Sequence, residues 1–216
     1  MQPEFLGSDP LSANQSCPNQ SFPNQPWSYL YFVKETGCSF ISPKDPGSEI
    51  AELAPIYAES FNGAPWFEVW TVESTSLTLR KYLVTKGDFV IGYSKSAVPL
   101  GFGIGIQINN YDGCQELIDR GLVSTSKVPG TYYVAELCTK GEARGQGICT
   151  NVLKGLIVAA KDQGFSEILT RTRVDNENMI RIFKRNGFEE LGRYPVETGG
   201  VESDRVVLKL NIESMR

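Results

Sequence analysis

The sequence predicts a mixed α/β (α+β) fold, in which helices flank a central sheet of mostly antiparallel strands. From Pro99 to Ile108, isoleucines alternate with small or polar residues, which is the period of a strand. From Ile148 to Gly164, apolar residues instead recur along one face of a helix. Several strand-like segments come before that helix, so the glycine-rich turn at its start follows a central strand of the sheet.

Size and composition predict one domain with an N-terminal extension. The chain has 216 residues, of which 41% are hydrophobic, and this is enough for one core. Residues 1–27 are rich in Ser, Asn, Gln and Pro and cannot bury much apolar surface. We expect them to be a disordered tail or the remnant of a leader, and we expect residues 28–216 to form the domain.

The first half of the domain is expected to contain two strands, two helices and two further strands. In chain order they cover residues 29–33, 39–41, 50–61, 72–83, 89–93 and 99–108. Ser48 is the expected N-cap of the first helix, and Pro55 predicts a kink or restart within it. The alternation in the last of these strands predicts one buried and one exposed face.

The second half begins with a polar, turn-rich stretch at 109–131, which predicts a surface excursion with a short helix near 115–119. The elements expected after it are a strand, a helix, a strand, a helix and two strands. They cover residues 132–139, 148–164, 167–172, 176–186, 188–194 and 205–212. Gly164 and Gly187 are natural residues to end the two helices.

Chemistry that depends on histidine is excluded, because the sequence contains none. Ser-His-Asp and Cys-His catalysis are thereby removed, together with the commonest metal ligand. The five cysteines form neither a close pair nor a metal-ligand spacing, so we expect free thiols and no metal. They are Cys17, Cys38, Cys114, Cys138 and Cys149.

Charge and hydropathy bear on partners and location. A net charge of -4 argues against a dedicated nucleic-acid-binding protein, which would carry clustered Lys and Arg. No apolar run has the length of a membrane span, and the N-terminus lacks the regions of a secretory signal. We therefore expect a cytoplasmic protein that binds neither nucleic acid nor membrane.

The glycine turn, residues 144–150, reads Arg-Gly-Gln-Gly-Ile-Cys-Thr and lies between a strand and a helix. At a helix N-terminus several backbone N–H groups lack partners, and the helix dipole adds partial positive charge. Such a turn can bind a phosphate through its backbone. A P-loop is disfavoured because no Gly-Lys-Ser/Thr follows, and a dinucleotide fold would need these glycines in its first βαβ unit.

Further motifs surround the glycine turn. Asn176 begins a predicted helix that residues 186–188, Asn-Gly-Phe, bring to a close. Residues 65–71 read Pro-Trp-Phe-Glu-Val-Trp-Thr and connect the first two predicted helices. Together with the turn, these motifs resemble the GNAT family of acyl-CoA-dependent N-acetyltransferases over about residues 39–212. The resemblance implies the GNAT acyl-CoA acyltransferase fold, with its central sheet splayed around the cofactor.

The match to the family's pyrophosphate pattern has one departure. That pattern is Arg or Gln, two residues, Gly, one residue, and then Gly or Ala. Arg144 and Gly147 fill the first two places, and Cys149 stands where Gly or Ala is usual. A cysteine at a helix N-terminus could be a reactive thiol or a small apolar side chain. Thr139 takes the place of the family's usual strand-end valine.

The resemblance implies acetyl-CoA (coenzyme A) as the cofactor and names the residues that would bind it. The backbone of Leu137, Cys138 and Thr139 would pair with the pantetheine, and Asn176 would contact it from the other side. Phe183 would pack against the same arm. The pyrophosphate would be held by backbone donors of Arg144, Gly145, Gln146, Gly147, Ile148, Cys149 and Thr150.

Transfer of an acetyl group to an amine needs a group that takes the amine's proton. Glu136 lies on the strand beside the expected thioester and is the candidate general base, directly or through water. A bulge in this strand would change which way Glu136 faces. The alternatives are that Glu136 binds the acceptor's ammonium group or makes a structural hydrogen bond.

The proton for the departing sulfur has no obvious source in the chain. The family often has a tyrosine seven residues after the helix-opening asparagine, and this sequence has Phe183 there. Either another group such as Tyr133 or Tyr194 supplies the proton, or coenzyme A leaves as a solvated thiolate. A thiol has a much lower pKa than an alcohol, which makes the second route plausible.

The acceptor is predicted only as an amine, of a small molecule or of a peptide N-terminus. Trp66, Glu68 and Trp70 could bind it, because amphipathic aromatic residues commonly line small-molecule clefts. Packing of the first two helices is the alternative for the tryptophans, and plain surface for Glu68. Residues 109–130 are expected to shape the choice of acceptor.

Two other functions fit the same resemblance. A regulatory protein could keep the acyl-CoA cleft and lose transfer, and Phe183 and Cys149 motivate that reading. An enzyme could instead move or decarboxylate an acyl group on sulfur. The last strands of such domains often meet a second copy, which leaves a homodimer as one option.

Overall fold

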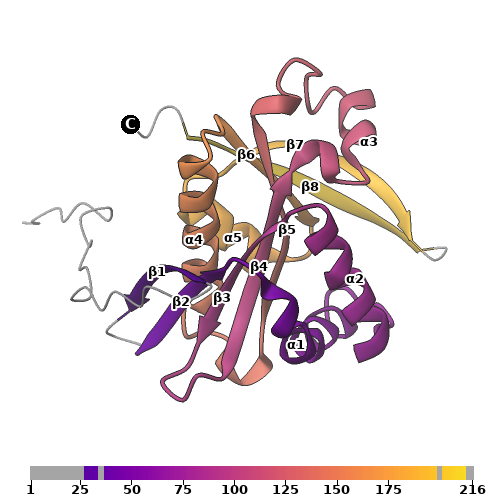
Figure 1. Cartoon of the computed structure of the whole chain (residues 1–216). Helices are drawn as coiled ribbons and strands as arrows, with labels where there is room; N and C mark the ends of the chain where they lie inside the picture. The colour runs from indigo at the N-terminus through magenta and orange to yellow at the C-terminus, as the bar shows by residue number, and fades with distance from the viewer. Residues whose placement is uncertain (1–26, 34–36, 199–200, 213–216) are drawn as a thin grey trace, which may run out of the picture.

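The computed structural model describes residues 27–33, 37–198 and 201–212. These residues form one eight-stranded sheet with helices on both faces (Figure 1). The tail expected over residues 1–27 lies outside the described residues, except for Trp27, which begins the first strand. The α+β architecture predicted from the sequence is confirmed.

The strands follow the chain closely across the sheet, in the order β1-β2-β3-β4-β5-β6-β8-β7. Neighbouring strands are antiparallel except β5 and β6, which are parallel. Their bounds are β1 Trp27–Val33, β2 Cys38–Pro43, β3 Asp88–Tyr93, β4 Pro99–Gln107, β5 Thr131–Thr139, β6 Glu167–Arg173, β7 Glu189–Thr198 and β8 Val201–Asn211.

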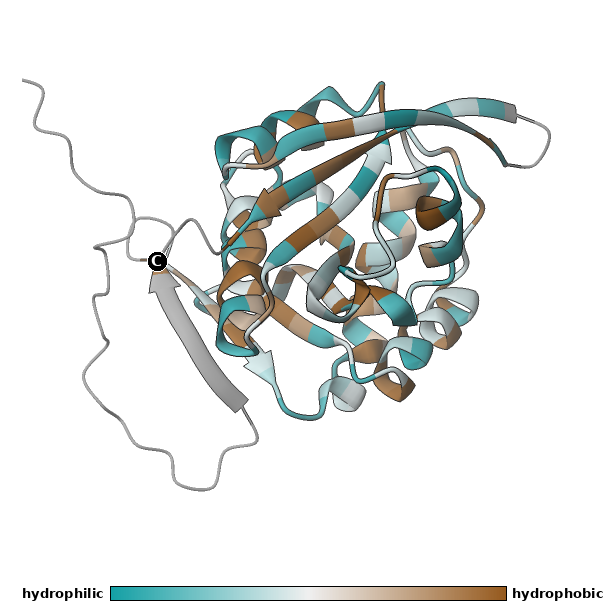
Figure 2. Cartoon of the chain, turned by 90° about the horizontal axis from the view of Figure 1, so that it is seen from above, coloured by the Kyte–Doolittle hydropathy of each residue, from teal (hydrophilic) through white to brown (hydrophobic). Residues whose placement is uncertain are grey.

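The helices divide between the two faces of the sheet. On one face lie α1 (Ile50–Asn62), α2 (Val72–Val84) and the short α3 (Cys114–Asp119), and on the other lie α4 (Ile148–Asp162) and α5 (Glu177–Arg185). Each face has its own hydrophobic cluster, centred on α1 and on α4. Figure 2 shows the hydrophobic residues gathered on the strands and on the helices that cover them. Among the described residues, no helix is long and apolar enough to cross a membrane.

Strand β4 is buried on both faces, so the predicted exposed face is wrong. Its isoleucines pack under α1, and its glycines lie under α4. A Cβ on Gly103 would come within 2.7 Å of Val152 and 2.9 Å of Leu156. The small residues of the alternation therefore mark the close approach of a helix to the sheet, not a solvent-facing side.

Helix α1 has a different N-cap from the one predicted and runs through its proline. Glu49, not Ser48, is the N-cap, and Ser48 belongs to a 3-10 turn before the helix. Pro55 lies inside the continuous helix Ile50–Asn62, so the expected restart is wrong. The start of α2 is as predicted, because the Thr71 hydroxyl accepts from the Ser74 N–H in a capping box.

The excursion before β5, residues 109–131, is more buried than predicted. It consists of 3-10 turns at Ile108–Asn110 and Val128–Gly130 around α3. Leu117 and Val123 are buried, and the ring of Tyr111 stacks on that of Tyr133 with 4.2 Å between centroids. These apolar anchors are spaced irregularly, so no helix or strand period reveals them. The excursion therefore forms part of the core on the α1 face.

The last two strands are longer than expected and form a hairpin that reaches past the body of the sheet (Figure 1). The added part that the structure describes, residues 195–198 and 201–204, is mostly polar and lacks the alternation of a half-buried strand. Cross-strand pairing holds it instead, as between Pro195 and Asp204 and between Glu197 and Glu202. The hairpin brings Arg205 onto the α1 face of the sheet beside Arg173.

Candidate functional site

The parallel strands β5 and β6 separate partway along their length. Their pairing runs from Thr131 opposite Glu167 to Val134 opposite Thr170 and then ends. The Thr170 hydroxyl donates to the Val134 carbonyl at 3.0 Å and thereby satisfies the last paired position. Beyond it, β5 stays paired with β4 and β6 stays paired with β8. The backbone edges of residues 135–139 and 171–173 therefore face each other without pairing, as expected of a sheet splayed around a ligand.

The glycine turn lies at the end of this opening. Gly145 and Gly147 both have φ of 78°, in the left-handed region that disfavours other residues. Among the described residues, the N–H groups of Gly145 and of residues 147–150 find no backbone or side-chain acceptor. A Cβ on Gly145 would meet nothing within 4 Å. The turn thus presents free donors at the start of α4, which is the geometry that binds a phosphate.

Not every N–H of the turn points outward. Arg144 donates to the Gly141 carbonyl at 3.2 Å, and Gln146 donates to the Ala143 carbonyl at 3.4 Å. These bonds fold the turn itself, and both side chains are exposed. Arg144 and Gln146 can therefore reach an anion only through their side chains, while the glycines and the first residues of α4 supply backbone donors.

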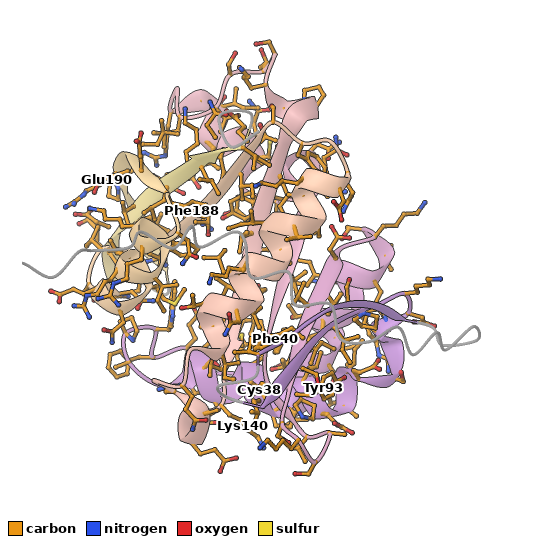
Figure 3. The ribbon with its side chains drawn as sticks, turned by 90° about the vertical axis from the view of Figure 1, so that its left-hand side faces the viewer. Cys38, Phe40, Tyr93, Lys140, Phe188 and Glu190 are labelled. Carbon is orange, nitrogen blue, oxygen red and sulfur yellow. The ribbon has the colours of Figure 1, made fainter. Side chains whose placement is uncertain are left out.

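The turn is fixed to its surroundings from two sides. The Glu59 carboxylate of α1 accepts from the Gly141 N–H at 2.9 Å, and the Lys140 N–H donates to the Leu100 carbonyl of β4 at 2.9 Å. In Figure 3, which looks onto the α4 face, Lys140 lies near one end of α4 and Phe188 near α5. The free donors of the turn are consequently held in place before any ligand binds.

Cys149 is a packing residue in this structure. Its Sγ lies 3.8 Å from Sδ of Met179 and so links α4 to α5. Burial raises the pKa of the Cys149 thiol to about 12, and the nearby Thr139 hydroxyl lowers it only in part. At neutral pH the thiol is protonated, so the geometry favours the small apolar role over the reactive one. The Thr139 hydroxyl oxygen is itself buried and has no hydrogen-bond partner among the described residues.

Asn176 and Phe183 occupy different environments on α5. Asn176 is the N-cap residue, and its side-chain amide donates to the Thr172 hydroxyl of β6 at 3.1 Å, near the opening. Phe183 is only 2% exposed, and its ring packs against Phe188 at 5.2 Å. Phe183 therefore forms the wall behind the opening and offers little surface of its own.

A bulge in β5 decides which way Glu136 faces. Val134 pairs with Gly105 and Glu136 pairs with the adjacent Ile104, so Ala135 has no partner on β4. The extra residue places Tyr133 and Glu136 on the same face although they are three positions apart, an offset that puts residues of a regular strand on opposite faces. That face is covered by α1 and α2, whereas Leu137 lies on the α4 face, against Gly103.

The Glu136 carboxylate is held by two tyrosine hydroxyls. Tyr82 of α2 donates to its Oε1 at 2.7 Å, and Tyr57 of α1 donates to the same atom at 3.3 Å. Burial raises the pKa of Glu136 to about 7, and the negative charge of Glu68 adds to the rise. Hydrogen bonds from both tyrosines oppose it by stabilising the charged form. Among the described residues, Oε2 has no hydrogen-bond partner, which leaves it available to a ligand.

Trp66, Glu68 and Trp70 lie in the connection between α1 and α2, next to this carboxylate. The Trp70 indole N–H donates to the Glu68 carboxylate at 2.6 Å, and the Trp70 ring meets the ring of Tyr57 edge-on at 5.2 Å. Trp66 packs on Phe61 at 5.4 Å. The two readings are thus compatible for Trp70, which packs on α1 and contacts Tyr57, whose hydroxyl binds Glu136.

The structure adds residues that the sequence interpretation did not select. Tyr57 and Tyr82 lie within the predicted helices 50–61 and 72–83, and no spacing distinguishes a tyrosine whose hydroxyl reaches a carboxylate. Arg171 and Arg173 alternate on one face of β6, and charged residues on a strand face expected to be buried are a signal that could have marked them. Tyr133 and Tyr194 are buried on the same face, where Tyr194 accepts from Arg171 at 2.7 Å. No cluster of metal-binding side chains occurs in the described part of the chain.

Comparison with known proteins assigns the family. The sequence profile of the Acetyltransferase (GNAT) family matches residues 50–188, and the chain belongs to this family. Acetyl-CoA is the family's cofactor, and the yncA protein of Salmonella typhimurium was solved with it. The structural match covers 81% of this chain and 94% of the yncA chain, with 13% sequence identity and a TM-score of 0.62. The structure of an N-acetyltransferase from Staphylococcus aureus Mu50 is also similar, with 15% sequence identity and a TM-score of 0.63. That match covers 81% of this chain and 98% of the Staphylococcus aureus chain.

A curated relative shares part of the sequence. N-alpha-acetyltransferase 30 of Schizosaccharomyces pombe is 35% identical over 80 residues, which are 37% of this chain. The match spans about half, 53%, of that relative. The sequence prediction of a GNAT member with acetyl-CoA as its cofactor is confirmed.

Proposed function

We propose that this protein transfers the acetyl group of acetyl-CoA to a primary amine, of a small molecule or of a peptide N-terminus, in a ternary complex. The observation that carries the proposal is Glu136, which lies beside the opening between β5 and β6 and has a pKa raised to about 7. A carboxylate with this pKa is a suitable proton acceptor at neutral pH. Family membership supports acetyl-CoA as the donor.

The residues around the opening fit coenzyme A. Free N–H groups of Gly145 and of residues 147–150 would bind the pyrophosphate, aided by the start of α4. The unpaired backbone edge of Leu137, Cys138 and Thr139 would pair with the pantetheine, and the orphaned Thr139 hydroxyl offers one further polar atom. Asn176 lies on the opposite side of the opening, and Phe183 supports that side from behind.

Glu136 would act on the acceptor from the α1 face. Bound acetyl-CoA supplies the thioester whose C–S bond breaks as the acceptor nitrogen forms the new C–N bond. An amine that arrives as ammonium must lose one proton before its nitrogen attacks, and Oε2 of Glu136 is the free acceptor for that proton. The nitrogen loses a second proton, to water, as the amide forms. Tyr57 and Tyr82 hold Oε1 and thereby fix the direction in which Oε2 points.

No acid of the chain is assigned to the departing sulfur. Phe183 has no hydroxyl, and the Tyr194 hydroxyl is bonded to Arg171. Burial also raises the pKa of Tyr133 well above its ordinary value. A thiol pKa near 8.5 lets the sulfur leave as a thiolate with little assistance, so we propose that it takes its proton from water.

Two observations support an amine as the acceptor. The relative from Schizosaccharomyces pombe is named as an N-alpha-acetyltransferase, which favours an α-amine. The carboxylates of Glu68 and Glu136 near the opening suit an ammonium group that arrives charged.

Acetyl transfer can be tested by following coenzyme A release with acetyl-CoA and a panel of amines, with the acetylated product identified by mass spectrometry. Glu136→Gln keeps the shape and the two tyrosine contacts but cannot take a proton, so kcat should fall by about 10²–10⁴-fold. Glu189→Gln, which changes an exposed carboxylate on β7, is the matched control. Equal turnover of the Glu136→Gln protein would remove Glu136 as the base. Tight acetyl-CoA binding without transfer to any amine would refute the proposed reaction.

A further inference from the structure

A group of arginines lies on the α1 face of the sheet, beside the opening. Four arginines lie there, and only two carboxylates come within ion-pair distance of them in the described part of the chain. Glu116 is shared by two arginines, and Asp175 pairs with one. The pairs are Arg120–Glu116 at 3.1 Å, Arg171–Glu116 at 3.5 Å and Arg173–Asp175 at 2.8 Å.

Arg205 is the member of this group without a carboxylate. Only 7% of it is exposed, yet no Asp or Glu among the described residues lies within 4 Å of its guanidinium. Its contacts are a 2.8 Å hydrogen bond to the Ser203 hydroxyl and the face of the Trp66 ring at 5.2 Å. Burial and the positive charges of Arg171 and Arg173 lower the pKa of Arg205. A buried charge is normally paired, so this one calls for an anion.

The position of Arg205 connects it to the proposed acceptor site. It pairs across the strands with Arg173, so both side chains project on the face that also carries Glu136. Glu68 interacts electrostatically with Glu136 and with both arginines. Its charge raises the pKa of Glu136 and also affects the pKa values of Arg173 and Arg205. The carboxylate of Glu136 and the guanidinium of Arg205 therefore lie on either side of Glu68, on one face of the sheet.

We propose that the acceptor is a small amine that carries its own carboxylate, an amino acid, with Arg205 binding the carboxylate while the amine is directed to Glu136. This inference rests on the proposed acetyl transfer and specifies its acceptor. Arg is suited to the task because its planar fork binds a carboxylate through two parallel hydrogen bonds. The Trp66 ring limits how far the guanidinium can move. A peptide whose N-terminal residue is neutral lacks the required anion next to the amine.

The first test compares acceptors with the unaltered protein. Transfer rates are measured for glycine, L-alanine, L-methionine, L-glutamate, L-lysine and β-alanine, each beside its own carboxamide. The carboxamide keeps the amine and loses the negative charge. For the best amino acid, kcat/KM should exceed that of its carboxamide by about tenfold to a hundredfold, the value of a charge-assisted hydrogen-bond pair. Equal or higher kcat/KM for the carboxamide, or for a neutral tetrapeptide amide, would overturn the inference.

The second test removes the guanidinium of Arg205 by substitution. Arg205→Met keeps an apolar stem under Trp66 and removes the charge, and Arg193→Met removes an exposed arginine of the adjacent strand β7 as the matched control. Arg205→Met should raise KM for the amino acid by about tenfold or more and leave KM for the carboxamide and the affinity for acetyl-CoA unchanged. A purely structural role would instead change both acceptors equally and lower the melting temperature.

Failure of the inference can be told apart from failure of the proposed transfer. Equilibrium dialysis of the same radiolabelled amino acids, in the presence of coenzyme A, measures binding without turnover. Binding that Arg205→Met abolishes supports the carboxylate site even if no acetyl group is transferred. Transfer to amines that lack a carboxylate, with no amino acid bound, would leave the transferase standing and overturn the carboxylate site.

Discussion

The hydroxyl of Tyr82 donates to Oε1 of Glu136 at 2.7 Å, across the gap between α2 and β5. This contact stabilises the charged carboxylate, while burial stabilises the neutral one. The balance holds the pKa of Glu136 at about 7 and not higher. Tyr82 therefore holds the Glu136 carboxylate in place and lowers its proton affinity, which makes Tyr82 a positioning residue for the proposed base.

Tyr82→Phe is expected to move the pH dependence of the reaction. The loss of a hydrogen bond to the carboxylate raises the pKa of Glu136 further, by about 0.5–1 unit. The rising limb of kcat/KM against pH should shift to higher pH by that amount. Both proteins are measured with the same acceptor, so that titration of the amine affects the two profiles alike.

Tyr93→Phe, on β3 and beside Ser39, serves as the control for this shift. Its profile should coincide with that of the unaltered protein. Coincident profiles for Tyr82→Phe as well would show that the limb does not report Glu136.

Glu136→Gln is expected to stabilise the fold at neutral and higher pH. The folded-state pKa of about 7 exceeds the unfolded value near 4.3, so the folded chain holds the proton more tightly. The contribution to stability is complete below about pH 4.3 and is lost as pH rises through 7. Glutamine stays neutral, so its advantage should be absent at pH 4 and reach about 1–3 kcal/mol at pH 8.

Thermal unfolding of both proteins across this pH range measures the effect. A difference in melting temperature that is constant from pH 4 to pH 8 would contradict the assignment of a raised pKa to Glu136.

Gly147→Asp is expected to weaken acetyl-CoA binding by more than tenfold. The substitution puts a carboxylate beside the free N–H groups of the glycine turn and also disfavours φ of 78°. Gly164→Asp is matched to it, because Gly164 has φ of 80°, open space for a Cβ, and a place at the other end of α4. Isothermal titration with acetyl-CoA measures the affinity of both variants. Because backbone strain is common to both, a difference in affinity reports the carboxylate at the glycine turn. Equal affinities would remove the pyrophosphate assignment.

Gly103→Ala is expected to destabilise the fold by about 1–3 kcal/mol, because its Cβ would meet Val152 of α4 at 2.7 Å and the side chains of Leu137 and Leu156. Gly63→Ala is the comparison, since the nearest atom to its Cβ would lie at 3.9 Å. Urea unfolding measures both. Similar stabilities for the two variants would show that α4 can move away from the sheet at little cost.

The chain sequence predicts most elements of this fold and the place of the glycine turn. The helix from Ile148 and the strand before it carry strong periodic signals, so their bounds agree with α4 and β5. The exposed face assigned to β4 is wrong because alternation with glycine resembles alternation with surface residues. Pro55 is tolerated because tertiary packing of the buried residues around it, such as Leu53 and Ile56, outweighs one lost backbone hydrogen bond.

The site is less predictable, since its members come from distant segments. Glu136 could be selected from its place on the strand, but its facing depends on the unpaired Ala135, which has no sequence signature. Tyr57 and Tyr82 reach Oε1 only after α1 and α2 have packed on the sheet. Arg205 begins a predicted strand, and only the pairing of β8 with β6, which puts Arg205 opposite Arg173, reveals a buried charge without a carboxylate at ion-pair distance among the described residues.

The bulge at Ala135 changes which positions of β5 face α1. Upstream of it, odd-numbered positions such as Tyr133 face α1, and downstream of it even-numbered positions such as Glu136 do. Loss of this one residue would leave the strand able to pair along its whole length. Glu136 would then still face α1, whereas a regular strand that kept Ala135 would turn the Glu136 carboxylate to the α4 face, away from Tyr57 and Tyr82.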